Sequence, residues 1–224
     1  MKLGLALALS VGLVLGMFAF SAWAWVLLPS DAWLPVHWGP SGQPDRYGGK
    51  GEALLVTPAM AAVVTAILAL LPRVEPRRAN LIASSGAYAV IWIAVVAFLA
   101  AVHVFLVLTS VGVAISVYAA LPVAVGALFI VIGAQLGKTR SNFFMGVRTP
   151  WTLSSELSWA RTHRVGGRAF IVLGLLFLLA GATNDPRLLF AVVVGLPIMI
   201  IGLVAYSYVV WRSDPGRTGA SSAG

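Results

Sequence analysis

Long runs without any Asp, Glu, Lys or Arg most strongly constrain what this chain can fold into. These runs are Leu3–Ser30, Ala53–Pro72, Ala79–Gly137, Ala169–Asn184 and Leu188–Trp211. A helix needs about 20 mostly apolar residues to cross a hydrocarbon core of roughly 30 Å. Helices satisfy their backbone hydrogen bonds internally, which the apolar interior of a membrane requires. We therefore predict an all-α, polytopic helical membrane protein.

The runs predict six transmembrane helices. Ala79–Gly137 is long enough for two crossings, with a reversal near residues 109–112. Ala169–Asn184 is short, so its helix is expected to begin near Val165, with Arg168 reaching up to the headgroups. Lys2 and the small residues around Trp23 also resemble a secretory leader. Its apolar stretch is longer than the usual leader core, so we expect retention; cleavage, leaving five helices, is the alternative.

The basic residues predict the orientation of the chain. With the N-terminus inside, the outer side holds Arg46, Lys50 and Arg187, and every other Lys and Arg falls inside. Because cytoplasmic loops retain Lys and Arg, both termini are expected in the cytoplasm. The net charge of +8 then reflects topology and contact with anionic membrane lipids. No direct nucleic-acid binding is expected, since the basic residues are spread over several inner segments.

Three regions follow from this topology. Residues 1–72 hold the first two helices and an outer loop, 29–52. Residues 73–212 hold four helices and a long inner loop, 138–167. Residues 213–224 form a tail rich in Gly and Ser, for which a disordered cytoplasmic segment is expected.

Two polar motifs interrupt the apolar sequence. The outer loop reads Leu-Pro-x-His-Trp over Leu34–Trp38 and then Gly-x-Pro-Asp-Arg-Tyr-Gly-x-Lys over Gly42–Lys50. Residues before proline avoid the helical region, so Leu34–Trp38 should be extended, followed by turns. The inner loop carries Gly146–Leu153, then Trp159, Thr162, His163 and Arg164.

The inner loop predicts a short helix of its own. Thr152 is a candidate N-cap for a helix over Leu153–Val165, which Gly166-Gly167 should end before the fifth span. Helical spacing places Leu157, Arg161, Arg164 and Arg168 on one side, and Trp159 and His163 on the opposite one. Within the membrane, His103 is expected to be a packing residue, and Gly12-x-x-x-Gly16 and Gly133-x-x-x-Gly137 offer close helix contacts.

The inner motif resembles the signature of the SdpI-like family, bacterial membrane proteins known as immunity and signalling factors against a secreted toxin. The outer motif is similar to a small domain of unknown function that often precedes that segment. The resemblance implies a non-enzymatic membrane immunity or sensor protein. Its partners would be a secreted peptide toxin outside and a cytoplasmic winged-helix repressor inside.

The resemblance and the residue chemistry together give two candidate contact sets. Toxin contacts are expected from Trp33 and from His37, Trp38, Gly42, Pro44, Asp45, Arg46, Tyr47 and Lys50. Contacts with a cytoplasmic partner are expected from Asn142, Gly146, Arg148, Thr149, Pro150, Trp151, Thr152, Trp159, His163 and Arg164. A purely structural alternative places the aromatic residues in the interfacial belt, Asp45 and Arg46 in the turn, and the arginines on phosphate headgroups.

Other functions are weighed against the immunity hypothesis. A small-molecule permease or exporter subunit is one alternative, and an assembly factor for another membrane protein is the second. The chain lacks HExxH, GxSxG and phosphate-loop motifs, and it has no cysteine, so no enzyme and no cofactor are expected. His37 and Asp45 would supply only two metal ligands where zinc needs three or four, so no metal site is predicted.

Overall fold

The structure is a computed structural model that describes residues 2–217. Its elements in chain order are α1 (Lys2–Leu27), β1 (Trp33–Trp38), β2 (Pro44–Gly49), α2 (Lys50–Val74), α3 (Arg78–Ala83), α4 (Ser85–Ser110), α5 (Val117–Leu136), α6 (Pro150–Leu153), α7 (Glu156–Thr183) and α8 (Pro186–Arg212). Within the described residues, six helices are long and apolar enough to cross a membrane: α1, α2, α4, α5, α7 and α8. The predicted fold class is confirmed, with one small β-hairpin added.

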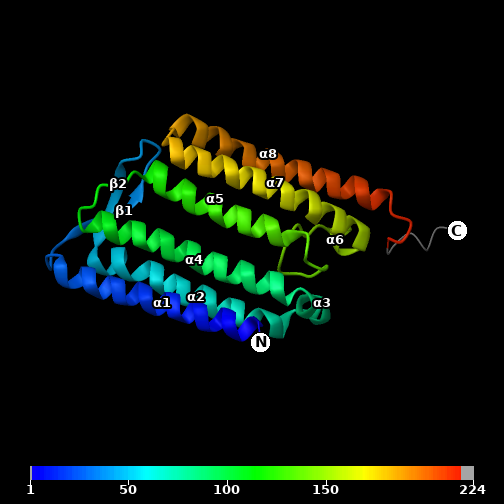
Figure 1. Ribbon diagram of the computed structural model, residues 1–224, viewed down its shortest axis with the longest axis horizontal. Helices are drawn as coiled ribbons and strands as arrows, with labels where there is room; N and C mark the ends of the chain where they lie inside the picture. The colour runs from blue at the N-terminus through cyan, green and yellow to red at the C-terminus, as the bar shows by residue number, and fades with distance from the viewer. Residues whose placement is uncertain (1, 218–224) are drawn as a thin grey trace.

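The six long helices lie side by side with roughly parallel axes (Figure 1). Helices α1, α2 and α4 contact one another as one group, α7 packs on both α5 and α8 in a second, and α4 joins the groups through α5. The β-hairpin covers one end of the bundle, called here the hairpin end. Helices α3 and α6 lie at the opposite end, the loop end, where α1 begins and α8 ends.

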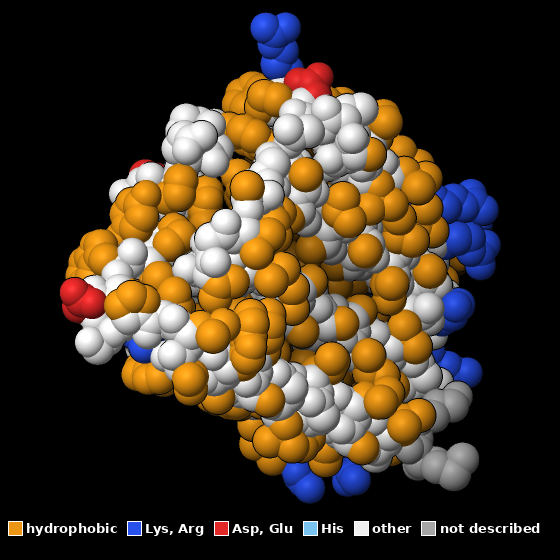
Figure 2. All heavy atoms as spheres, turned by 60° about the vertical axis from the view of Figure 1, so that its left-hand side comes forward, with side chains coloured by type: hydrophobic (Ala, Val, Ile, Leu, Met, Phe, Trp, Pro, Cys, Tyr) orange, Lys and Arg blue, Asp and Glu red, His pale blue; other side chains and the backbone are white. Residues whose placement is uncertain are grey.

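The outer surface of the bundle is apolar. Figure 2 shows hydrophobic side chains over most of the visible face, with Lys and Arg confined to its margins. Leu15, Ile67, Val172 and Ile201 each leave more than half of their surface exposed. A protein dissolved in water rarely exposes so large a continuous apolar area. The arrangement suits a multi-pass membrane protein, whose solvent is lipid.

Glycines bring α5 and α7 into close contact. A Cβ atom added at Gly133 would lie 2.6 Å from the carbonyl oxygen of Gly167, and one at Gly167 would lie equally close to that of Gly133. Gly126 and Gly174 form a second such pair. The helices therefore approach at backbone distance. A Cβ at Gly137 would meet its nearest atom at an ordinary 3.7 Å, so the predicted seam is confirmed at Gly133 and wrong at Gly137.

The inner helix predicted over Leu153–Val165 is wrong in its bounds. Helix α7 begins after Ser155, whose side chain caps it, and runs without a break through Gly166-Gly167 into the membrane span. Those glycines are buried, and the close pairing of Gly167 with Gly133 explains why a glycine stands there. They serve helix packing rather than helix termination.

The hairpin confirms that Leu34–Trp38 is extended. Strands β1 and β2 pair in antiparallel register, with irregularities on either side of His37. Its turn contains Gly42 at a φ of +76°, a conformation that favours glycine. Leu34 is buried against the ends of α1, α2 and α4, and the Trp38 ring packs 4.9 Å from that of Phe105. The hairpin therefore packs directly against the ends of the helices.

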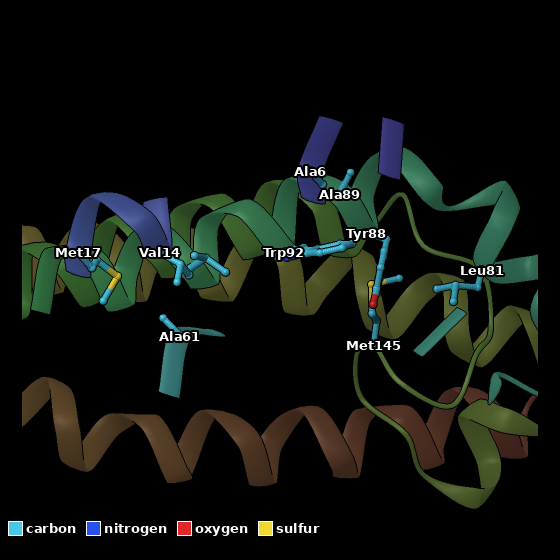
Figure 3. Close-up of a cluster of buried hydrophobic side chains, with 10 residues drawn as sticks. Ala6, Val14, Met17, Ala61, Leu81, Tyr88, Ala89, Trp92 and Met145 are labelled. Carbon is cyan, nitrogen blue, oxygen red and sulfur yellow. The ribbon is translucent and has the colours of Figure 1, made fainter. Parts of the chain in front are cut away.

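The core of the first helix group receives one residue from far along the chain. Figure 3 shows the cluster, in which Val14, Met17, Ala61, Tyr88 and Trp92 come from α1, α2 and α4. Met145 belongs to the same cluster, although it lies in the loop between α5 and α6. This loop therefore packs against the first helix group and not only against its own neighbours.

Candidate functional site

His163 organises the loop that precedes α7. Its imidazole is fully buried, and Nδ1 lies 2.8 Å from the carbonyl oxygen of Trp159, which can only accept a hydrogen bond. Nδ1 therefore donates, and Nε2 accepts the backbone N–H of Val147 at 3.0 Å. The Trp159 ring stacks on the imidazole, with 3.9 Å between centroids. Residues 138–155, called here the signature loop, are thus attached to α7 by a neutral histidine.

Gly146 makes that attachment geometrically feasible. Its φ is +99°, and a Cβ atom added there would lie 1.9 Å from Nε2 of His163. Any other residue would be strained in its backbone and would collide with the ring. The glycine therefore allows the loop to approach close enough for Val147 to reach the histidine.

Asn142 holds the turn that delivers Met145 to the core. Its side-chain oxygen accepts the backbone N–H groups of Phe144 and Met145 at 2.9 and 2.7 Å. Its side-chain nitrogen donates to the carbonyl oxygen of Arg140 at 2.8 Å. The residue is fully buried, so all three contacts stay inside the protein. Asn142 therefore fixes the conformation of the loop backbone at this turn.

Thr149 and Thr152 shape the short helix α6. Thr149 is the N-cap: its hydroxyl accepts the backbone N–H of Thr152, while the Thr152 hydroxyl accepts the backbone N–H of Thr149 at 2.9 Å. Pro150 follows as the first helical residue, a position where its missing N–H costs nothing. The prediction that Thr152 is an N-cap is wrong, since it is the third helical residue of a capping box.

The signature loop also reaches α8 and the residues beyond it. The indole N–H of Trp151 donates to the hydroxyl of Ser207. Ser155 donates to a carboxylate oxygen of Asp214 at 2.5 Å. This side-chain hydrogen bond and the backbone N–H of Gly216 hold the pKa of Asp214 below its usual range. The C-terminal end of the loop is therefore fastened to α8 and to Asp214.

A second set of contacts, called here the clasp, joins the signature loop to residues 75–84. Glu75 is only 4% exposed, and its carboxylate accepts the backbone N–H groups of Arg77 at 2.8 Å and Phe143 at 3.1 Å. The Arg77 guanidinium donates to the hydroxyl of Ser141 and to the carbonyl oxygen of Leu153, the latter at 2.7 Å. The connection after α2 and the loop before α7 thus share one polar network.

Two further residues extend the clasp. The side-chain nitrogen of Asn80 donates to the carbonyl oxygen of Ser141 at 2.8 Å. The hydroxyl of Ser84 accepts the backbone N–H of Arg140 at 2.9 Å. The two helix groups are therefore connected by side chains at the loop end as well as by the contact between α4 and α5.

The sequence did not reveal the clasp. In the sequence, Arg77 serves only as a marker of topology, and no local motif contains Glu75, Asn80 or Ser84. One available signal was Glu75 itself, an acidic residue between Arg73 and Arg77 in a short connection that otherwise favours cations. An isolated acid beside several bases indicates a specific contact, but it does not name the partner.

The structure corrects the predicted set of cytoplasmic contacts. Asn142, Thr152, Trp159 and His163 are buried with at most 1% of their surface exposed, so a partner cannot touch these side chains in this structure. Thr149 and Trp151 are half-buried. The members left open to a partner are Gly146, Arg148, Pro150 and Arg164. Arg161 and Arg168 are exposed on the face of α7 that carries Arg164, as the helical spacing predicted.

The outer contact set is corrected in the same way. Lys50 is buried, and its ammonium group donates to the carbonyl oxygens of Trp25 and Leu28, where it closes the end of α1. Gly42 lies against the ring of Tyr118, whose hydroxyl donates to the Pro40 carbonyl oxygen. With Trp38 packed on α4 and Pro44 half-buried, these members support the hairpin.

The remaining members of the outer set are open. Trp33 is 70% exposed, and Tyr47 is exposed close to it on the paired strand. His37 and Asp45 form an exposed pair, with 2.5 Å between Nδ1 and a carboxylate oxygen, and Arg46 pairs with Glu52. Among the described residues, no three His, Asp or Glu side chains are grouped to hold a metal ion. The hairpin thus presents aromatic rings and mixed charge.

Comparison with known proteins agrees with the two motifs. Residues 138–208 match the SdpI/YfhL protein family, and residues 12–62 match a domain of unknown function, DUF1648. The immunity protein SdpI of Bacillus subtilis (strain 168) is 28% identical over 103 residues, which cover 45% of this chain and 50% of the relative. Residues 138–208 of the chain are thus similar to the SdpI/YfhL family. No solved structure matches it.

These matches give the SdpI-like segment a physical interpretation. It begins at Lys138, includes the whole signature loop and ends within α8, so it contains both partners of the His163 contact. The DUF1648 match covers most of α1, the hairpin and the first part of α2. The matched stretch spans about half the length of this curated relative.

Gly146→Ala should unfold the signature loop. The added methyl group would force the backbone out of its positive φ and break the bond between Val147 and His163, at a cost of about 2–4 kcal/mol. We expect a lower midpoint of thermal unfolding in detergent and faster tryptic cleavage after Arg148. Gly137→Ala is the matched control, because its Cβ meets only ordinary contacts. Equal behaviour of the two variants would contradict this account of the loop.

Proposed function

We propose that this chain is a membrane immunity protein that protects the cell carrying it against a secreted, membrane-active peptide. The observation that carries the proposal is the SdpI/YfhL match over residues 138–208, together with a relative whose name is immunity protein SdpI. The described residues contain no cluster of metal ligands, and the sequence contains no catalytic motif that would favour an enzyme. The bundle and its two polar ends therefore carry the function.

The proposed orientation places the loop end in the cytoplasm of a bacterium. Arg73, Arg78, Arg140, Arg164 and Arg212 are exposed toward that end, whereas the hairpin end carries few cations. Cytoplasmic segments retain Lys and Arg. The hairpin then faces the outside, where a secreted peptide arrives. The few charges at the hairpin end include Asp45 and Arg46, which are exposed and available to it.

The hairpin is proposed as the first contact of the peptide. Exposed aromatic rings and arginines are typical of binding hot spots, and Trp33, Tyr47 and Arg46 supply both. The strands rest on the helix ends through Leu34 and Trp38, so little ordering is needed on binding. A rigid hairpin with an open contact face is suited to recognising a peptide.

The exposed cations of the signature loop and α7 are proposed as the contact for a cytoplasmic winged-helix repressor. Arg148 and Arg164 belong to the predicted set, and Arg161 and Arg168 extend the same basic surface. The buried His163 and Trp159 hold the loop in the shape that presents Arg148. A partner with an acidic face would complement this surface. Anionic lipids would meet its margin at the membrane.

Replacing His37 and Asp45 by Ala should reduce protection without reducing the amount of protein in the membrane. Both side chains are exposed and contact mainly each other, so their loss removes a recognition feature and leaves the hairpin packing intact. The assay is survival of a toxin-sensitive bacterial strain that expresses the chain, challenged with candidate secreted peptides. Asp31→Ala, an exposed acid at the same end, is the matched control.

We expect at least a tenfold loss of survival for the double variant and none for Asp31→Ala. Ten-fold corresponds to about 1.4 kcal/mol of binding free energy, a modest hot-spot contribution. The absence of protection by the unaltered chain against every candidate peptide would contradict the immunity function itself. Unchanged protection by the double variant would contradict only the role of the hairpin.

Replacing Arg148 and Arg164 by Ala should weaken capture of the repressor at the membrane. Each removes one exposed charge from the basic surface, whereas Arg73→Ala with Arg212→Ala removes two exposed charges elsewhere at the loop end. The measurement is the fraction of repressor that sediments with membranes when toxin is present. We expect a drop of about fivefold or more for the first pair only. Equal effects of both pairs would show general charge attraction and contradict a defined docking surface.

A further inference from the structure

A groove of about 690 Å³ opens between α1 and α4 on the side of the bundle. Its walls come from α1, with Gly12, Gly16 and Phe20, and from α4, with Ile93 and His103. All of these residues belong to the apolar spans, so the groove lies at membrane depth. His103 is the one residue with a titratable side chain in its lining.

The floor of the groove is a stripe of small residues on α1. Ala8, Gly12 and Gly16 line the groove at intervals of four residues, Gly4 continues the same spacing, and all four are exposed. A Cβ atom added at any of the three glycines would meet nothing within 4 Å. Glycine in a helix interior costs roughly 1 kcal/mol relative to alanine. Nothing among the described residues makes use of this open face.

The contact between α5 and α7 shows what kind of surface packs against such a stripe of small residues. On α5 and α7, the paired glycines Gly133 and Gly167 let two helix backbones touch. Small residues four apart serve the same purpose between transmembrane helices, which lack a hydrophobic driving force and depend on close packing. The stripe on α1 offers this surface to a helix that the chain does not itself provide.

His103 contributes an unpaired hydrogen-bond acceptor to the groove. Ser21 donates its hydroxyl hydrogen to the Leu54 carbonyl oxygen at 2.6 Å, so its oxygen can only accept from His103. Nε2 of His103 therefore carries the proton and donates to Ser21 and to the Met17 carbonyl oxygen, each at 3.1 Å. Nδ1 is left as an acceptor, and it has no hydrogen-bond partner among the described residues.

An unpaired acceptor is costly in hydrocarbon, where water cannot satisfy it. The His103 side chain is fully buried, and the Phe20 ring stands edge-on to it, with 6.4 Å between centroids and 82° between planes. Phe20 is also a wall of the groove and is only half-buried. His103 therefore contributes to the lining of the groove an acceptor that no described residue satisfies.

We propose that the groove is the docking site of a membrane-inserted α-helix from another chain, with a small-residue face and one hydroxyl or N–H donor level with His103. An alkyl chain would fill the groove but would leave Nδ1 unpaired. A second copy that presented the same groove would bring another His103 acceptor opposite the first. The proposal goes beyond the proposed function and holds whether or not the helix belongs to a toxin.

The test uses synthetic helices as probes. Three peptides of about 21 Leu and Ala residues, with glycines at four-residue intervals on one face, carry lysines at the cytoplasmic end to fix their direction. The first has a serine on the glycine face in its outer third, level with His103. The second has the serine in its inner third, and the third has none. Because the chain has no cysteine, Ser30→Cys provides a unique label for energy transfer to each peptide in nanodiscs.

We expect the outer-serine peptide to bind about threefold more tightly than the other two, as one interhelical hydrogen bond in a membrane allows. Gly12→Ile, which fills the groove, should weaken binding of all three peptides roughly tenfold. Gly202→Ile on α8, whose Cβ also meets nothing within 4 Å, is the matched control and should bind as the unaltered chain does.

His103→Phe separates the hydrogen bond from packing. It should abolish the preference for the outer serine while the protein keeps its thermal unfolding midpoint within the range of Gly202→Ile. Equal binding of the three peptides to the unaltered chain would overturn the proposal. So would Gly12-dependent self-association of the chain that excludes the peptides.

Discussion

The hydrogen bond from the backbone of Phe143 to the carboxylate of Glu75 joins two parts of the chain that are far apart in sequence. A buried carboxylate must be paired by donors, because leaving it unpaired costs several kcal/mol. The backbone N–H groups of Arg77 and Phe143 satisfy this requirement. The signature loop therefore cannot leave the first helix group without exposing or abandoning a buried charge.

This constraint explains why the residues that identify the signature point inward. The side chains of His163, Trp159 and Asn142 form hydrogen bonds with backbone groups of the loop and of α7. In the proposed orientation, the side chains that the loop exposes to the cytoplasm are chiefly basic. At the hairpin end the same division holds, since Lys50 and Trp38 support the hairpin while His37 and Asp45 face outward. Within each motif, some residues therefore form the scaffold, and others of the same motif remain exposed.

Coupling between the two ends has a physical route in this arrangement. The hairpin rests on α1, α2 and α4 through Leu34, and the clasp joins the end of α2 to the signature loop. A peptide bound at the hairpin or in the α1–α4 groove would bias the position of these helices. Such a bias reaches the loop only if the bundle has two discrete arrangements, which is the physical requirement for coupling.

The sequence predicted the helices well because hydrocarbon leaves the backbone few alternatives. It placed Arg161 and Arg164 on the face of α7 opposite His163, as the structure does, without showing which of the two faces is buried. It failed where tertiary contact decides the outcome. Gly166-Gly167 looked like a helix end, yet the close approach of α5 makes it a packing site.

The candidate site was predicted in location but not in structure. A Trp or His in a polar loop has the same chemistry whether it faces a partner or the core, so sequence alone did not separate Trp159 and His163 from Arg164. The clasp was missed because Glu75 and Phe143 lie 68 positions apart, and no local pattern links them. Composition identifies a membrane protein, whereas long-range hydrogen bonds decide which polar residues remain available.

The most direct test of the central claim, that the clasp holds the signature loop in place, is backbone hydrogen exchange in nanodiscs followed by mass spectrometry. The account predicts slow exchange in peptides that cover residues 139–147 of the unaltered chain. It predicts exchange roughly tenfold or more faster there in Glu75→Ala, because an amide bond to a charged acceptor is lost. Glu156→Ala, an exposed acid at the same end, should leave exchange unchanged. Fast exchange in the unaltered chain, or no difference between the two variants, would contradict it.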